Sequence, residues 1–438
     1  MKMMTKVTIL AKVRSNISLE LLRSSLTVQT ALLVLASSAF FILSYGISFN
    51  IVMYNYYLGG VSFLDGQNPY EVTLRNGPSN QFKYSPLFAL IMGGMARFSR
   101  QDMVVGLWLL VGMTAYSFGL SRWSSLARIA PFYVPLALFA GLIELTVSLS
   151  VNQSNALIIG LILIGLAEYR DGRHFSAGAI LLLATNFKVY PVIFLASLAL
   201  LLNPAYLYGA LSMGLATFLL PACFVGWSHN WNTHLAWFYT ILRDSSGPGI
   251  LNMLSAFQRN GLTGIGQIMH WLVLVISIPL FFSYVRLTRR VDWRPWMAFG
   301  IASLLLLSPR TEVFTYVLLA PSYVLMAIWC AESEQRIVRT YGGVTFAIFA
   351  VLIASMRYVD PQWYVSESPM EIVRVIGALG FWIFSGLIVA STIYPSKKAI
   401  ARHIDNDNID DTQPSSLRPQ QAKRFEEAAR AEASCHNP

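Results

Sequence analysis

Long stretches without charge alternate with short basic loops along this chain, and they constrain its fold more than any other feature. No charged residue occurs between Arg23 and Asp65, and the apolar run 30–49 is long enough for a helix to span a bilayer. Similar runs recur almost to the end of the 438 residues, of which 55% are hydrophobic and 12% charged, against about 25% charged in soluble domains. Because a spanning backbone must satisfy its own hydrogen bonds, the sequence predicts an all-α polytopic membrane protein.

The net charge of +10 fits the same class of protein. Cytoplasmic loops of membrane proteins collect Lys and Arg and face anionic lipid, so we prefer this interpretation to nucleic-acid binding. The three cysteines, Cys223, Cys330 and Cys435, indicate neither a disulfide framework nor a metal site. We interpret the first apolar run, which has a long basic lead, as a retained anchor and not as a cleaved signal peptide.

The basic residues give the helices an orientation. A scheme of about twelve transmembrane helices with both chain ends in the cytoplasm places every basic cluster inside. The run 86–98 is too short to cross and is interpreted as a re-entrant or interfacial helix. The predicted spans lie near 30–49, 103–120, 129–150, 155–167, 175–188, 190–202, 205–226, 269–286, 295–309, 313–331, 341–356 and 373–394.

This scheme divides the chain into three parts. Residues 1–29 form a cytoplasmic basic N-terminus, 30–394 a transmembrane domain, and 395–438 a cytoplasmic, largely disordered tail. The long segments 50–102 and 227–268 are external loops in this scheme, and they hold most of the unusual polar residues. We therefore expect function at the external face of a multi-pass protein of the plasma (inner) membrane.

Ionisable residues at membrane depth are the first candidates for a site. Glu144 lies in an apolar run, either as a functional acid or as a paired structural one. Lys188 precedes a helix break at Pro191, where it could bind a phosphate or serve a structural role. Arg310 and Glu312 share a tight external turn, and the planar fork of arginine suits phosphate unless the two residues only pair with each other.

Amide-rich segments add groups that hydrogen-bond without charge, as sugar hydroxyls require. VNQSN at 151–155 offers three amides and a hydroxyl, although capping of the next helix by Ser154 or Asn155 explains it equally well. A flexible segment combines Asn252 with Arg259, for which turn formation is the alternative. The sequence has no metal-binding spacing of His, Cys and Asp, no Gly-rich nucleotide loop and no GxSxG elbow, which disfavours ATP-driven and serine chemistry.

Six stretches of the chain carry a family resemblance. They are GQNPY (66–70), FKYSPLFALIMGGMARF (82–98), NQSNALIIGLIL (152–163), AGAILLLATNFKVYPVIFL (177–195), NMLSAFQR (252–259) and LLSPRTEVFTYVLLAP (306–321). In this order they resemble the motifs of glycosyltransferase family 87, which contains polyprenyl-phosphate-mannose-dependent mannosyltransferases with the C-type membrane fold. The resemblance implies that fold for the present chain.

The chain departs from this family at one position. Family members usually carry an aspartate general base at the end of the first span, in a D-x-x-x-Y setting. The match here is Asn50 before Tyr54 if two residues are inserted before GQNPY, and Val52 without that insertion; neither can take a proton. Asn50 can only hydrogen-bond a hydroxyl and cannot take its proton. Either the protein is catalytically altered, or another acid is the base: Asp65, Glu71, Glu144 or Glu312.

The resemblance implies an inverting transfer of a hexose, with mannose preferred, from a polyprenyl-phosphate donor to a hydroxyl of a lipid or glycan acceptor. It requires no cofactor, because the lipid phosphate already activates the sugar. Lys188, Arg310 or Arg259 would stabilise the departing phosphate, with Lys83 at the rim of the site. The residues that we expect to bind the sugar or the acceptor are Asn68, Tyr70, Tyr84, Asn152, Gln153 and Asn252.

A non-catalytic carrier or transporter of lipid-linked sugars on the same scaffold is the alternative. The missing aspartate favours the carrier, and the retained motifs favour the enzyme. Many transporters contain inverted repeats with broken helices in matching positions. No repeat links the two halves of this sequence.

Overall fold

The computed structural model of the protein describes residues 51–71, 82–123, 131–243, 253–287, 292–308, 313–355 and 370–393. Every regular element within these ranges is a helix, as the sequence predicts. The chain forms two units, Met1–Val389 and Ala390–Pro438. The helices belong to the first unit, and only the last turn of α16 lies in the second.

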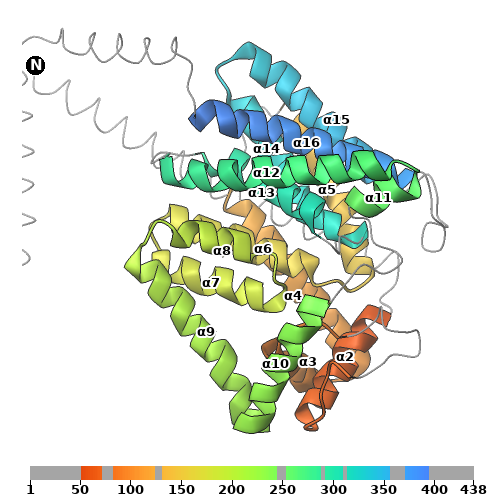
Figure 1. Cartoon of the computed structure of the whole chain (residues 1–438), viewed down its shortest axis with the longest axis vertical. Helices are drawn as coiled ribbons and strands as arrows, with labels where there is room; N and C mark the ends of the chain where they lie inside the picture. Colours follow the sequence, from red (N-terminus) through yellow and green to blue (C-terminus); the bar gives the residue numbers. More distant parts are fainter. Residues whose placement is uncertain are drawn as a thin grey trace, which may run out of the picture. The chain divides into compact units, whose positions relative to one another are not determined.

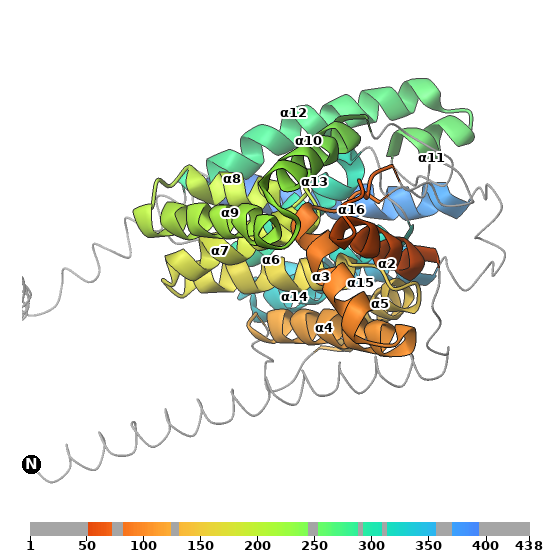
Figure 2. The ribbon, with the colours of Figure 1, turned by 90° about the horizontal axis from the view of Figure 1, so that it is seen from below.

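The helices of the first half are α2 (Ile51–Leu64), α3 (Pro86–Phe98), α4 (Gln101–Ser121), α5 (Tyr133–Ser150), α6 (Asn155–Arg170), α7 (His174–Phe187), α8 (Val192–Ala199) and α9 (Pro204–Val225). Among them, α6 packs between α4 and α7, and α9 packs against α7 (Figures 1 and 2). The second half contains α10 (Trp227–Arg243), α11 (Met253–Arg259), α12 (Thr263–Leu287), α13 (Trp293–Leu307), α14 (Ala320–Glu332), α15 (Gly343–Ser355) and α16 (Met370–Ile393). Two shorter elements complete it, the 3-10 helix η2 (Val313–Leu318) and the π-helical turn η3 (Val338–Gly342).

Local signals in the sequence explain where several of these helices begin. Ser85 accepts a hydrogen bond from the backbone N–H of Phe88 at 3.3 Å, and Asn203 does the same for Tyr206 at 3.2 Å. Each of these caps is followed by a proline in the first turn of its helix. Proline is suited to that position because its fixed φ is already helical and its missing N–H would have no partner there.

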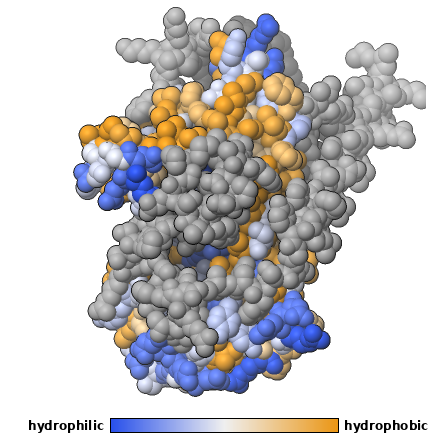
Figure 3. Space-filling view, turned by 90° about the vertical axis from the view of Figure 1, so that its right-hand side faces the viewer, coloured by the Kyte–Doolittle hydropathy of each residue, from blue (hydrophilic) through white to orange (hydrophobic). Residues whose placement is uncertain are grey.

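Within the described residues, six helical stretches are long and apolar enough to cross a membrane: 101–121, 133–150, 204–225, 263–286, 315–332 and 372–393. Apolar side chains cover much of the face in Figure 3, with a hydrophilic margin along its lower edge. Eleven of the predicted spans fall on described helices, and the span at 30–49 lies outside the described residues. Several of the eleven are shorter than a full crossing, so the count of twelve stays a prediction.

Glycines bring neighbouring helices to backbone contact. A Cβ atom on Gly119 of α4 would lie 2.7 Å from the carbonyl oxygen of Gly160 in α6. A Cβ atom on Gly160 would in turn overlap the backbone of Ala115. Gly60 and Gly93 allow the same close contact between the backbones of α2 and α3. Close approach of this kind is typical of helices packed in a membrane.

The two long segments that the sequence predicts to be external are more helical than the sequence indicates. Residues 50–102 contain α2 as well as the predicted helix at 86–98, which is α3 with the same bounds. Residues 227–268 contain α10 and α11 in full and the first residues of α12. The signal for α2 was present, since the interval without charge continues to Leu64.

Candidate functional site

The break between α7 and α8 places Lys188 against the first residue of α6. Lys188 ends α7 with an extended backbone, and α8 starts only after Pro191. The Lys188 ammonium donates a hydrogen bond to Oδ1 of Asn155 at 2.7 Å. The Tyr190 hydroxyl donates to the same oxygen at 3.2 Å. A buried amide therefore orients a cation at the point where two helices meet.

Aromatic rings frame this cation. The Lys188 Nζ lies 5.8 Å from the ring centroid of Tyr84 and 5.5 Å from that of Tyr190, both within the range of cation–π attraction. The Tyr84 ring stacks on Phe88 with centroids 4.4 Å apart. Its hydroxyl lies 2.8 Å from the hydroxyl of Tyr56. Burial raises the pKa of Tyr84 well above its usual value, so the hydroxyl stays protonated.

The turn before α6 completes the cluster through its backbone. Asn152 has φ 57°, a left-handed conformation that asparagine tolerates better than most residues. Its carbonyl accepts a hydrogen bond from Nε1 of Trp108 at 3.0 Å, and the N–H of Ser154 donates to the Tyr56 hydroxyl at 3.3 Å. The side chains of Asn152 and Gln153 are buried. Of the predicted amides at 151–155, Asn155 contacts Lys188 through its side-chain oxygen.

The segment before α3 ties the loop at 65–71 to this cluster. The Tyr70 hydroxyl donates to the backbone carbonyl of Tyr84 at 2.7 Å. Asn68 is engaged locally, since its amide donates to Glu71 at 2.8 Å and accepts from the Tyr70 N–H at 3.1 Å. The carbonyl of Lys83 accepts a hydrogen bond from Nε1 of Trp237 in α10 at 3.1 Å. Three of the predicted residues, Lys83, Tyr84 and Tyr70, therefore belong to one connected structure.

Asp65 lies away from this cluster. It forms an ion pair with Arg97 at 2.5 Å, and both side chains are about half exposed. Asp65 is nine residues beyond Tyr56, a displacement of about 14 Å at 1.5 Å per helical residue.

Glu144 is buried in a charge pair with Arg374, which the sequence did not single out. The two side chains lie in α5 and α16 and are both shielded from solvent. The guanidinium also lies over the ring of Tyr316, 4.3 Å from its centroid. Arg374 is one of only two charged residues in the apolar helix α16, and this isolated charge was the sequence signal that could have identified it.

The remaining predicted residues are Arg259 and four residues outside the described ranges. Arg259 is the last residue of α11, whose Phe257 packs against Gly266 of α12. Asn50, Asn252, Arg310 and Glu312 lie outside the described residues.

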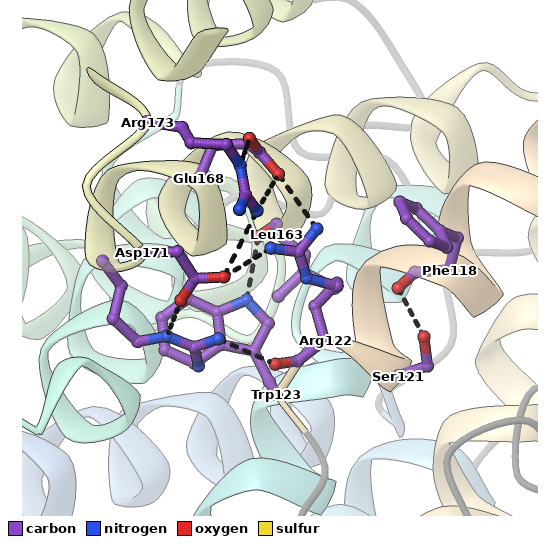
Figure 4. Close-up of polar contacts among 9 residues, drawn as sticks. Phe118, Ser121, Arg122, Trp123, Leu163, Glu168, Asp171 and Arg173 are labelled. Carbon is purple, nitrogen blue, oxygen red and sulfur yellow. Dashed lines mark hydrogen bonds and ion pairs between the residues drawn. The ribbon is translucent and has the colours of Figure 1, made fainter. Parts of the chain in front are cut away.

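A charged cluster occupies the opposite end of α6 (Figure 4). Arg122, at the end of α4, binds Glu168 at 2.9 Å and Asp171 at 2.5 Å, and Arg173 pairs with the same two acids. Burial alone would raise the pKa of Asp171, but hydrogen bonds from Arg170 and Arg122 hold that pKa below its usual value. These pairs fasten the ends of α4 and α6 to the start of α7.

The charges of Arg122, Arg170 and Arg173, which the sequence predicts to face the cytoplasm, are therefore partly neutralised by Glu168 and Asp171. Residues 155 and 170 are at opposite ends of the 16-residue helix α6, about 22 Å apart. The Lys188 cluster and the charged cluster thus lie at opposite ends of the same helices.

The chain matches a protein-family model. The model described as Glycosyltransferase family 87 covers residues 82–309, just over half of the chain. The matched region begins at the segment that carries Tyr84 and includes Asn152, Asn155 and Lys188. The comparison with curated proteins found no match.

Proposed function

Because the chain belongs to glycosyltransferase family 87 and is a membrane glycosyltransferase, we propose that it transfers a hexose, with mannose preferred, from a polyprenyl-phosphate donor. The acceptor is a hydroxyl of a lipid or glycan at the external face of the plasma membrane. The observation that carries the proposal is Lys188, which Asn155 and Tyr190 orient at the break between α7 and α8.

Lys188 has the chemistry that a phosphate leaving group needs. When the bond between the sugar and the lipid phosphate breaks, negative charge develops on the phosphate oxygens. A positioned ammonium stabilises this charge more in the transition state than in the bound donor. Neutral groups hold the Lys188 ammonium, namely the Asn155 amide oxygen and the Tyr84 and Tyr190 rings.

The depth of the cluster also suits a lipid-linked donor. Trp108 contacts the turn at Asn152 and lies seven residues after Gln101, the first residue of α4. The cluster is therefore about 10 Å below the outer end of α4. A phosphate on a membrane lipid can reach that depth while its chain stays in the bilayer.

The reaction has a simple balance of bonds. The acceptor oxygen attacks the anomeric carbon opposite the phosphate and inverts its configuration. The bond from that carbon to the phosphate oxygen breaks, and its electron pair stays on the phosphate. A carboxylate takes the hydroxyl proton. We keep Asp65, Glu144 and Glu312 as candidates for this base, with Asn50 as a hydrogen-bonding partner of the hydroxyl.

The experiment compares two cations. The purified protein in nanodiscs is given radiolabelled polyprenyl-phosphate mannose and a membrane lipid extract as acceptor. We expect Lys188→Gln to lower sugar transfer about 100- to 1,000-fold, as the loss of one electrostatic stabiliser does. The control is Arg100→Gln, an exposed residue paired with Asp102 at the start of α4, which should keep wild-type transfer.

Two results would contradict the proposal. Full transfer by Lys188→Gln would remove Lys188 from the phosphate site. Tight donor binding by the wild type without any transfer would favour the carrier on the same scaffold. Activity with other polyprenyl-phosphate sugars, but not mannose, would correct the donor sugar alone.

A further inference from the structure

Helix α10 turns its apolar side outward, the reverse of a helix that faces water. Five of its exposed large residues recur at intervals of three or four along the chain, so they form one stripe on the helix, and the exposed Tyr239 lies next to Phe238 in the chain. We call these five residues the α10 stripe: Trp227, Trp231, Leu235, Phe238 and Leu242, which are 59%, 49%, 41%, 56% and 67% exposed. An aromatic stripe with this exposure requires an apolar or interfacial environment.

The inner side of α10 is polar and firmly attached. Asn230 and Thr233 are buried, and the Asn230 amide donates to the carbonyl of Phe218 in α9 at 2.9 Å. His229 packs against the ring of Phe63 in α2 with centroids 5.7 Å apart. Further along, the Trp237 indole holds the Lys83 carbonyl. These contacts fix which side of α10 faces away from the protein.

The position of α10 in the chain points to the bilayer as its partner. Only Gly226, with φ 80°, separates it from α9, which is long and apolar enough to span a membrane. Of the apolar window in α9, 17% is buried inside the protein, so most of it faces lipid. Figure 1 shows α10 running across the direction of α6, α7 and α8. A helix that starts where a span ends and then crosses the bundle lies in the plane of the membrane surface.

We propose that α10 docks on the external leaflet, with its stripe in the boundary between headgroups and acyl chains. Trp and Tyr favour this boundary because an apolar ring and a polar tip are both satisfied there. The docked helix then holds the Lys83–Tyr84 segment in place through the Trp237 hydrogen bond. The proposal does not depend on the identity of the donor or the acceptor.

Depth-dependent quenching tests the docking. In a chain without its native cysteines, single cysteines at position 235, 224 or 67 carry an environment-sensitive fluorophore in nanodiscs. Nitroxide lipids place the quencher either near the headgroups or deep in the acyl chains. We expect the label replacing Leu235 to be quenched most by the shallow nitroxide. The label replacing Phe224 on α9 is the lipid-exposed control, and that replacing Gln67 is the aqueous control.

Two variants separate docking from the attachment to Lys83. W231Q/F238Q should abolish the quenching of the Leu235 label and raise hydrogen–deuterium exchange in residues 82–85. Trp237→Phe should leave the quenching unchanged and raise the same exchange about three- to tenfold, the effect of one lost hydrogen bond.

Two outcomes would overturn the proposal. The first is a Leu235 label that lipid nitroxides quench no more than the Gln67 label. The second is protection of the stripe only in a dimer, which would assign the stripe to a second copy of the chain. Neither readout measures sugar transfer, so a failure here is distinct from a failure of the proposed function.

Discussion

Glu144 and Arg374 meet as a charge pair shut off from water, and this placement allows a structural acid to be told from a catalytic one. Taking both charges out of water is costly, and the pair offsets that cost only while both partners are present. Removal of one partner leaves an uncompensated buried charge, whereas removal of both leaves an apolar site.

We therefore expect Arg374→Met to lower the free energy of unfolding by about 3–5 kcal/mol, and the double variant E144L/R374M to recover most of it. Thermal denaturation in nanodiscs measures both effects. Sugar transfer by the double variant then decides the role of Glu144. A stable but inactive double variant would identify Glu144 as the base, and an active one would exclude it.

The local sequence pattern identifies some residues of the site but not others. Lys188 was predictable because a proline three positions later breaks the helix and exposes a turn. Tyr56, Trp108 and Tyr190 were not, because their contacts join positions distant in the chain, such as Tyr56 with Ser154 at a separation of 98 residues. Local pattern carries no information about such pairs. The same holds for the 230 residues between Glu144 and Arg374.

Among the helices, α3 was predicted with its observed bounds because a separate apolar run starts at Pro86 and ends at Phe98, and the structure adds a cap at Ser85. The neighbouring α2 was missed, since the same interval without charge contains the predicted first span. Length alone cannot show where one apolar helix ends and the next begins. The glycines that lock these helices together depend on the crossing geometry, which the sequence does not give.

The crossing of α4 and α6 provides a matched test on one helix. Gly119→Val would push a branched side chain into the carbonyl of Gly160 and Cβ of Leu163, whereas Gly106→Val meets no described atom within 4 Å. Both changes lie in α4 and alter its intrinsic helix propensity equally. We expect Gly119→Val to cost about 1–3 kcal/mol more than Gly106→Val in thermal unfolding. Equal destabilisation by the two variants would mean that the crossing tolerates extra volume.

For the molecule as a whole, the decisive property is sidedness. The Lys188 cluster and the charged cluster around Arg122 occupy opposite ends of α6, so a membrane around α6 and its neighbours separates the two clusters. In a chain without native cysteines, we expect Gln67→Cys to react with a membrane-impermeant maleimide in intact cells. Glu334→Cys, in the exposed turn after α14, should react only after permeabilisation. Labelling of both positions in intact cells would refute the predicted orientation of the basic loops.

The glycine contacts also limit which substitutions this sequence can accept during evolution. A larger residue at Gly300 would meet the side chain of Phe281. A smaller residue in place of Phe281 could make room for that larger residue. A larger residue at Gly160 would meet the backbone of Ala115 and Tyr116, which every substitution retains. Change at Gly300 can therefore be rescued by a second mutation, while change at Gly160 can be rescued only by moving a helix. In relatives that keep this helix crossing, we therefore expect position 300 to covary with position 281 and Gly160 to be invariant.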